Sequence, residues 1–470
     1  MLELLLIPSV VIFGLSFIKS DKTKQLLAYI AFLILLPTTR LLILPKPFNL
    51  LGSYLVVDDL GAYILFVSSI VGIGVALALM TLEKHVNVSQ NAYRRFYRFF
   101  AVFWIGLILS ILSNHMGIYW IGLELATLST VYMIKTNHSK MAHREAWNYM
   151  IVGTVAISLV LFGIILIYAS AKPILGEEAM NFDLLLSHAK EIKSPFLFNI
   201  GFAIVSVGMF VKMGFFPMNL WLANIERASF YPVAALFSGI LESAVIIGFF
   251  RFSKIAIQIN CRYTFIFVFV YTILTIFIVS FLIFRTKDFM RLFSLSGIEH
   301  MALITLFWVS GGTFAALLHF GAHAFLKPAL FLSTGVLESS GKYKMAGSLK
   351  GYRGRKGTLF WFLVSLFLLA VISLPPSPMF FSELYGFGSM IKTAKTANFL
   401  LAMLGVISIL LVLLSVIFYK FIEIYQSMKY EGREEEKKVY TSELVSLMIF
   451  AASLVVLITP PVISYLKGIS

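Results

Sequence analysis

The sequence has few charged residues and almost no cysteine. Only 13% of its 470 residues are Asp, Glu, Lys or Arg, whereas soluble proteins contain about 25%. This scarcity excludes an ordinary soluble enzyme. The single cysteine, Cys261, cannot by itself hold an iron–sulfur cluster, a Cys-rich zinc site or an internal disulfide. Nucleotide-binding loops and catalytic triads are also missing, so we expect no cofactor and no redox centre in this chain.

Apolar residues dominate instead. They make up 59% of the chain, and the mean hydropathy is +0.91, which is typical of a membrane protein. The net charge of +15 comes from Lys and Arg in short loops between apolar runs. That distribution indicates membrane topology rather than nucleic-acid binding. The first apolar run lacks the basic start of a cleavable signal, so we expect it to be retained as a span.

The apolar runs predict an all-α polytopic membrane protein with about 14 transmembrane helices. A spanning helix needs about 20 mostly apolar residues. The predicted spans are 2–18, 26–44, 60–82, 99–115, 117–134, 147–169, 196–225, 231–250, 263–284, 289–309, 313–338, 358–391, 398–422 and 443–466. The loops that follow the odd-numbered spans hold most of the Lys and Arg, with the largest cluster at 342–356. This asymmetry predicts that both termini lie outside. The longest loop, about 170–195, is expected to hold a short interfacial helix.

Lys212 lies midway along the run 196–225, and Gly214 and Pro217 follow it. A lysine in the bilayer is costly and is usually functional, and a break at that depth needs protein or water to satisfy the freed backbone groups. The natural partner for this lysine is Glu124, the one acid in the run 117–134. The alternatives are a structural lysine bound to freed carbonyls and a neutral, hydrogen-bonded Glu124.

His319, His323 and Lys327 are spaced by four, which places them on one face of a helix, and Pro328 follows them. We expect this row to end at a helix break and to relay protons. Phe320 stands where a zinc-binding helix of the zincin type has Glu, so no metal is expected. The alternative is polar packing between helices.

A second break is predicted at 374–378, followed by Glu383. Three more ionisable residues lie inside predicted spans: the neighbours Glu299 and His300, and Glu242. The interrupted runs 196–225 and 358–391 are five spans apart and therefore cross the bilayer in opposite directions. This is the pattern of inverted repeats with sites at broken helices.

We therefore expect four segments. These are 1–98 (three N-terminal helices), 99–252 (first five-helix repeat), 253–425 (second, inverted repeat) and 426–470 (cytoplasmic loop and last helix).

Seven motifs in this order resemble the antiporter-like membrane subunits of respiratory complex I, group 4 hydrogenases and multi-subunit cation/proton antiporters, with most similarity to the hydrogenase branch. The motifs lie within about 55–425. They are Trp120–Leu125, Glu145–Tyr149, Lys212–Pro217, Tyr231–Gly239, Ser296–Met301, His319–Phe331 and Leu374–Glu383.

The resemblance implies a fourteen-helix fold of two inverted five-helix repeats in a prokaryotic cell (inner) membrane. It also implies roles. Glu124 and Lys212 would be a coupled acid–lysine pair, His319, His323 and Lys327 a central relay, and Glu383 the last group toward the outside. This chain departs from the family at Ser243, beside Glu242, where relatives often have a lysine.

The function that follows is a proton-translocating subunit of a redox complex. Its expected partners are other membrane subunits, a peripheral iron–sulfur arm reached through them, and the lipid bilayer. Two alternatives remain: a subunit of a cation/proton antiporter, and a structural subunit that does not pump.

Overall fold

The computed structural model describes residues 2–17, 35–80, 90–135, 139–338, 354–393, 397–427 and 439–469. Within these ranges the chain is mostly helical, as predicted for a membrane protein. Nine of the described helices are long and apolar enough to cross a membrane, or ten if one bent pair counts as a single span. Because some residues lie outside the described ranges, the predicted total of fourteen transmembrane helices is not tested.

The chain forms two compact units, and each is described separately. Unit 1 contains Met1–Ser69, Val88–Ala228 and Ile240–Val270. Its elements are α1 (Leu2–Leu15), α3 (Leu35–Ile43), β1 (Phe48–Leu51), β2 (Leu55–Val57), α6 (Gln90–Leu112), α7 (Met116–Ile134), α8 (Lys140–Leu175), η1 (Gly176–Met180), α9 (Phe182–Ser187), η2 (Ala189–Glu191), α10 (Pro195–Lys212), α11 (Asn219–Ala228) and α13 (Glu242–Ile259).

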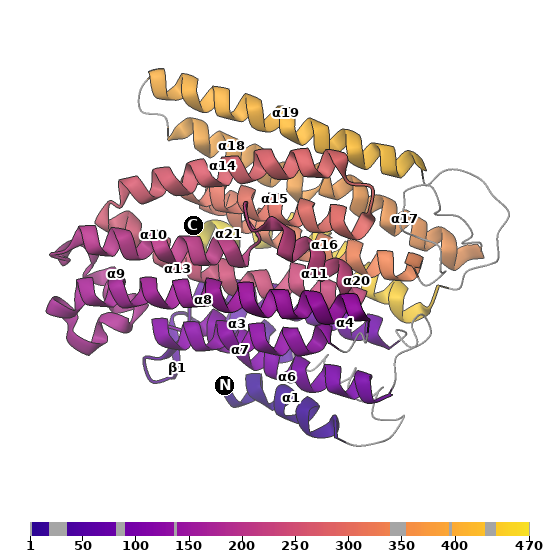
Figure 1. Cartoon of the computed structure of the whole chain (residues 1–470), viewed down its shortest axis with the longest axis horizontal. Coiled ribbons are helices and arrows are strands. Elements are labelled where there is room, and N and C mark those ends of the chain that lie inside the picture. The colour runs from indigo at the N-terminus through magenta and orange to yellow at the C-terminus, as the bar shows by residue number, and fades with distance from the viewer. Residues whose placement is uncertain are drawn as a thin grey trace. The chain divides into compact units, whose positions relative to one another are not determined.

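Close backbone contacts between glycines hold the long helices of unit 1 together. Along α8 and α10, which run side by side in Figure 1, a Cβ added at Gly163 would lie 2.6 Å from the carbonyl oxygen of Gly201. Along α6 and α7, a Cβ at Gly106 would lie 2.8 Å from the carbonyl oxygen of Gly122. Small residues at such crossings let membrane helices approach closely. Because α7 also packs on α8, the side chains of α7, α8 and α10 lie within reach of one another.

The antiparallel hairpin β1–β2 was not predicted. It lies next to an ion pair, in which the buried Arg251 on α13 contacts the partly exposed carboxylate of Asp58 at 3.0 Å. Arg251 also donates to the backbone carbonyl of Ser113. Asp58 in turn accepts from the backbone N–H of Gly61 and directly precedes α4 (Asp59–Leu79). These contacts fix one end of unit 1.

Unit 2 contains Ile70–Asn87, Ser229–Gly239 and Tyr271–Ser470. Its elements are α12 (Tyr231–Leu236), α15 (Phe289–Val309), α16 (Thr313–Glu338), α17 (Gly354–Val371), α18 (Pro378–Lys392), α19 (Ala397–Ser427), α20 (Thr441–Leu457) and α21 (Pro460–Ile469). Three further elements have residues in both units: α4, the π-helical turn η3 (Phe237–Leu241) and α14 (Arg262–Arg285).

The break predicted after Lys327 is wrong. Helix α16 continues through Pro328 to Glu338. Proline removes one backbone hydrogen bond and crowds the preceding turn, but the proline ring here packs on Gly239, which has no side chain to obstruct it. A proline can stay inside a membrane helix where neighbouring elements accommodate it.

The last predicted span, 443–466, is not one straight helix. It divides into α20 and α21, which meet at 69°. Thr459 precedes Pro460 and Pro461 at this bend, and the residue before a proline is disfavoured in the helical region. The proline pair was therefore a break signal within a run that had been interpreted as continuous.

Other predictions agree with the structure or lie outside it. The loop 170–195 does contain a short helix, α9, together with η1 and η2. The start of the predicted span 26–44 and most of the basic cluster 342–356 lie outside the described residues.

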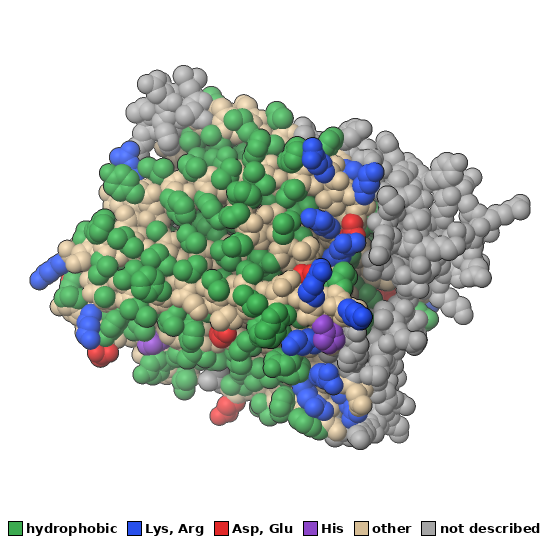
Figure 2. Space-filling view, viewed as in Figure 1, with side chains coloured by type: hydrophobic (Ala, Val, Ile, Leu, Met, Phe, Trp, Pro, Cys, Tyr) green, Lys and Arg blue, Asp and Glu red, His purple; other side chains and the backbone are tan. Residues whose placement is uncertain are grey.

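Hydrophobic side chains cover most of the visible surface of the helices in Figure 2. On α8 of unit 1, Trp147, Ile151, Val155 and Phe162 are each about half exposed. Lys140 and Arg144, at the start of that helix, are also exposed. An apolar side with basic residues at the helix end is the distribution expected at a membrane boundary.

Candidate functional site

Lys212 is the last residue of α10, and a local hydrogen-bond motif explains why the helix ends there. Gly214 has φ of +72°, and its N–H donates to the carbonyl of Val211 at 3.1 Å. The N–H of Phe215 donates to the carbonyl of Phe210 at 2.9 Å, and the two phenyl rings stack. This is the Schellman ending, including its hydrophobic contact. The predicted break is confirmed, and Lys212 lies directly before it.

The amine of Lys212 is buried among aromatic and hydroxyl groups, with 3% of the residue exposed. It donates to the hydroxyl of Tyr149 on α8 at 3.1 Å. It also lies 4.5 Å from the centre of the Tyr149 ring and 6.0 Å from that of Trp221. Gly153, one turn further along α8, leaves the space that the amine occupies, since a Cβ there would lie 3.3 Å from it.

The Tyr149 hydroxyl connects the lysine to α7. It lies 3.0 Å from the hydroxyl of Thr130, which donates to the carbonyl of Thr127 at 2.7 Å. The Tyr149 ring stacks on Trp221 with centres 5.1 Å apart. Trp221 donates from its indole N–H to the carbonyl of Val211 and so ties α11 to the end of α10. Four segments therefore fix the position of one amine.

Glu124 lies on α7, one turn before Thr127, and is half-buried. Its carboxylate interacts electrostatically with Lys212, but the direct hydrogen bond of the amine is to Tyr149. One carboxylate oxygen, Oε2, is buried and has no hydrogen-bond partner among the described residues. The predicted pairing is thus an electrostatic interaction between neighbours, not a hydrogen-bonded ion pair.

In unit 2, the predicted row on α16 is fully buried. The exposed fractions of His319, His323 and Lys327 are 0%, 1% and 0%. The amine of Lys327 donates to the Ser296 hydroxyl and to the carbonyl of Phe293, both on α15.

The histidines of unit 2 make separate contacts. His319 lies between two partners: its Nε2 is 3.0 Å from Nδ1 of His300, and its Nδ1 is 2.8 Å from the Ser382 hydroxyl. His323 contacts a different group, the carbonyl of Ser238, at 3.2 Å. Glu299 is buried, and its carboxylate lies 3.9 Å from Nδ1 of His300.

Helix α17 ends in the same way as α10. Ser373 has φ of +58° and donates its N–H to Ala370, and Leu374 donates to Leu369. The Ser373 hydroxyl donates to the buried carboxylate of Glu383 on α18. Ser377 begins that helix by accepting from the N–H of Phe380. The second predicted break is confirmed, and Ser373, the residue with left-handed backbone conformation at this break, binds the predicted Glu383.

The NADH:quinone oxidoreductase/Mrp antiporter, TM, family matches residues 113–415. The chain belongs to this family. Both breaks, Lys212 and Lys327 lie within the matched range.

Individual relatives agree with this antiporter family assignment. The chain is 30% identical over 347 residues to the "Hydrogenase-4 component F homolog" of Methylacidiphilum infernorum (isolate V4), covering 71% of each chain. It superposes on a chain of the membrane-bound sulfane sulfur reductase, an archaeal respiratory membrane complex, with a TM-score of 0.85 and 19% identity over 99% of this chain and 95% of that one. It also superposes on a chain of the Mrp complex from Dietzia sp. DQ12-45-1b, with a TM-score of 0.83 and 14% sequence identity over 99% of this chain and 95% of that one. The last two likenesses show the fold.

Of the site residues predicted for this family member, Glu242 belongs to unit 1, where it is buried at the start of α13 directly after the π turn. The others form the two groups just described. Reasoning from titratable residues missed the hydroxyl groups Tyr149, Thr130, Ser296, Ser373 and Ser382. Hydroxyls in apolar runs usually bond to carbonyls of their own helix, so single residues gave no clear signal. The family motifs that contain Tyr149, Ser296 and Ser382 were the one feature of the sequence that could have indicated these hydroxyl groups.

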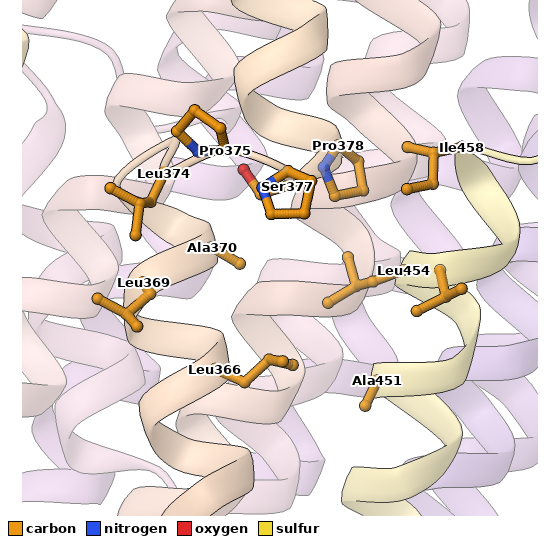
Figure 3. A pocket seen from close by; sticks show the side chains of 12 residues that line it. Leu366, Leu369, Ala370, Leu374, Pro375, Ser377, Pro378, Ala451, Leu454 and Ile458 are labelled. Carbon is orange, nitrogen blue, oxygen red and sulfur yellow. The ribbon is translucent and has the colours of Figure 1, made fainter.

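The described residues include no group of three or more His, Cys, Asp or Glu side chains arranged to hold a metal ion. A cavity of about 250 Å³ adjoins the α17–α18 break (Figure 3). Its lining is almost wholly apolar and includes Leu366, Leu374 and Leu454, with Ser377 as the one polar side chain. Because an ordered water needs two to four polar partners, this cavity does not suit proton transfer.

Proposed function

We propose that this chain is a proton-translocating subunit of a membrane-bound oxidoreductase complex of the hydrogenase or NADH dehydrogenase type. Electron transfer would take place in partner subunits. The observation that carries the proposal is the burial of Lys212 at a helix break, where its amine is hydrogen-bonded to the neutral hydroxyl of Tyr149. A buried lysine costs free energy and persists where it has a task.

In unit 1, Glu124 provides the means of control. Its charge acts on Lys212 through a region of low dielectric constant, where electrostatic interactions are strong. A partner that moves or neutralises this carboxylate therefore changes how firmly Lys212 holds its proton. The half-buried position of Glu124 leaves it within reach of such a partner.

In unit 2, the relay consists of Lys327, His300 and His319, with Glu383 as the group that passes protons to the outside. Hydrogen bonds connect His300 to His319 and His319 to the helix that carries Glu383. His323 and Glu299 in this unit, and Glu242 in unit 1, are further buried ionisable groups of the proposed pathway. Each changes the local charge when it binds or releases a proton.

We further propose two inverted five-helix repeats within a fold of fourteen helices. The two breaks support this. Corresponding points of the two breaks are each 159 residues apart. The helices before the breaks end at Lys212 and Val371 (371 minus 212), and the left-handed residues are Gly214 and Ser373 (373 minus 214). The next helices start at Asn219 and Pro378 (378 minus 219). Equal spacing through an entire break supports a common origin for the two halves.

The proposed location is a prokaryotic inner membrane, with both termini outside and the basic start of α8 in the cytoplasm. The exposed apolar side of α8 would face lipid or a neighbouring membrane subunit. An iron–sulfur arm would be reached through those subunits.

The test is to replace Lys212 by Met in the native complex and to measure proton uptake by inverted membrane vesicles together with electron transfer. We expect uptake per electron to fall at least tenfold. Lys392→Met, which changes an exposed lysine at the end of α18, is the matched control and should pump normally. Wild-type uptake in Lys212→Met would contradict the proposal, and transport that requires Na⁺ would favour a cation/proton antiporter.

A further inference from the structure

A chain of four hydrogen-bonding groups connects α15, α16 and α18 within unit 2. The groups are His300 on α15, His319 on α16, and the Ser382 hydroxyl and Met379 carbonyl on α18. Their separations are 3.0, 2.8 and 2.7 Å. All are buried, with at most 2% of each residue exposed. The direction of each hydrogen bond follows from the last member, because a carbonyl oxygen can only accept.

The Ser382 hydroxyl has one hydrogen. It must point at Met379, since two oxygens 2.7 Å apart with no hydrogen between them would repel each other. Ser382 therefore accepts from His319, which places the proton of that ring on Nδ1. A neutral imidazole carries one proton, so Nε2 of His319 accepts from Nδ1 of His300. Nε2 of His300 is then left as a bare acceptor.

The structure agrees with this assignment at the other end. Nε2 of His300 is buried and has no hydrogen-bond partner among the residues described. Buried polar atoms are rarely left unpartnered, and each exception calls for an explanation. An open acceptor at the start of a directed chain is the place where a proton can be received.

We propose that Ser382 is the group through which protons leave the histidines toward Glu383. A proton binds to Nε2 of His300, the Nδ1 proton of His300 moves to Nε2 of His319, and the Nδ1 proton of His319 moves to the Ser382 oxygen. The Ser382 hydroxyl releases its own proton to a water on the Glu383 side. One proton enters, one leaves, and no electrons are transferred. The inference rests on the proposed function.

The direction of the chain gives Ser382 a second property. While its hydrogen points at Met379, the chain ends at a carbonyl, which cannot carry the proton further. Transfer therefore requires the hydroxyl to rotate away from Met379. Ser382 is thus a positioning and transfer group for His319, and its removal leaves the histidines with no outlet on α18.

The first experiment measures proton uptake per electron in the native complex. We expect Ser382→Ala to lower it at least tenfold, and Ser382→Thr, which keeps a hydroxyl, to stay within twofold of wild type. Ser389→Ala is the matched control, because that hydroxyl on the same helix also donates to a carbonyl one turn back, at 3.0 Å. If the alanine variant does not assemble, Ser382→Cys replaces it, because a thiol has a similar volume and is only a weak hydrogen-bond donor. We expect Ser382→Cys to lower proton uptake per electron several-fold.

The second experiment reads the tautomers by nitrogen NMR of the histidine-labelled complex, which has eight histidines in this chain. We expect His319 to carry its proton on Nδ1 in the wild type and on Nε2 in Ser382→Ala. Normal uptake in Ser382→Ala, or an Nε2 proton on wild-type His319, would overturn the inference. Failure of the proposed function would look different: Lys212→Met would then pump like the wild type.

Discussion

The amine of Lys212 and the hydroxyl of Tyr149 lie 3.1 Å apart, on two helices that pack along their length. The Thr130 hydroxyl lies 3.0 Å from that of Tyr149 and accepts from it, because its own hydrogen is donated to the carbonyl of Thr127. When the lysine is protonated, it donates to Tyr149 and Tyr149 donates to Thr130. When the lysine is neutral, its amine still has two N–H groups, so it can donate to Tyr149 while Tyr149 continues to donate to Thr130. The lysine therefore keeps a hydrogen-bond partner in both protonation states.

Tyr149→Phe removes this partner and retains the stacking on Trp221. We expect proton uptake per electron to fall several-fold, and its pH profile to change, because the lysine loses its hydrogen bond in both states. The measurement is vesicle acidification at several pH values. Tyr119→Phe is the control, since Tyr119 is equally buried but donates to the carbonyl of Val245. Equal effects in the two variants would argue against a role for Tyr149.

Gly297→Ala tests the space beside the second lysine. A Cβ at Gly297 would lie 3.9 Å from the His323 ring and 4.0 Å from the side chain of Lys327, which are ordinary van der Waals contacts. We expect the fold to be unchanged and transport to slow about threefold to tenfold, because the methyl group occupies room next to both titratable groups.

Gly388→Ala is the control for Gly297→Ala, since nothing lies within 4 Å of its Cβ. Transport in both variants is compared at equal amounts of assembled complex. Unchanged transport in Gly297→Ala would show that this space has no part in the relay.

Gly335→Ala, in contrast, should affect stability. A Cβ there would overlap the ring of Tyr231, which packs flat against α16. Overpacking of this kind costs about 1–3 kcal/mol. We expect a lower midpoint of thermal unfolding in the purified complex, with Gly405→Ala, whose Cβ meets nothing within 4 Å, unchanged. Equal midpoints would mean that the ring moves aside at little cost.

The sequence predicted the two functional breaks because Gly214, Pro217 and the prolines at 374–378 disrupt apolar runs where a charge is nearby. It failed at Pro328, where the same signal is present but Gly239 makes room for the proline ring. Whether a proline ends a helix depends on the neighbouring element, which a single sequence does not reveal.

Charged residues of the site were predictable because a buried charge is rare and costly. Their hydroxyl partners were not, because Tyr149 and Ser382 resemble ordinary packing residues until the helices are placed side by side. Glu124 was predicted as the charge partner of Lys212, and the two interact electrostatically, but the hydrogen bond of the amine goes to Tyr149. Which neighbour binds a charge is decided by tertiary contacts.

The central claim is that Lys212 in unit 1 and Lys327 in unit 2 serve one proton pathway. The most direct measurement is proton uptake per electron in Lys212→Met, Lys327→Met and the double variant of the native complex. Residues that act in series are strongly non-additive, so each single variant should lose most of the uptake and the double variant should lose no more. Wild-type uptake in either single variant, or independent and additive partial losses, would contradict the claim.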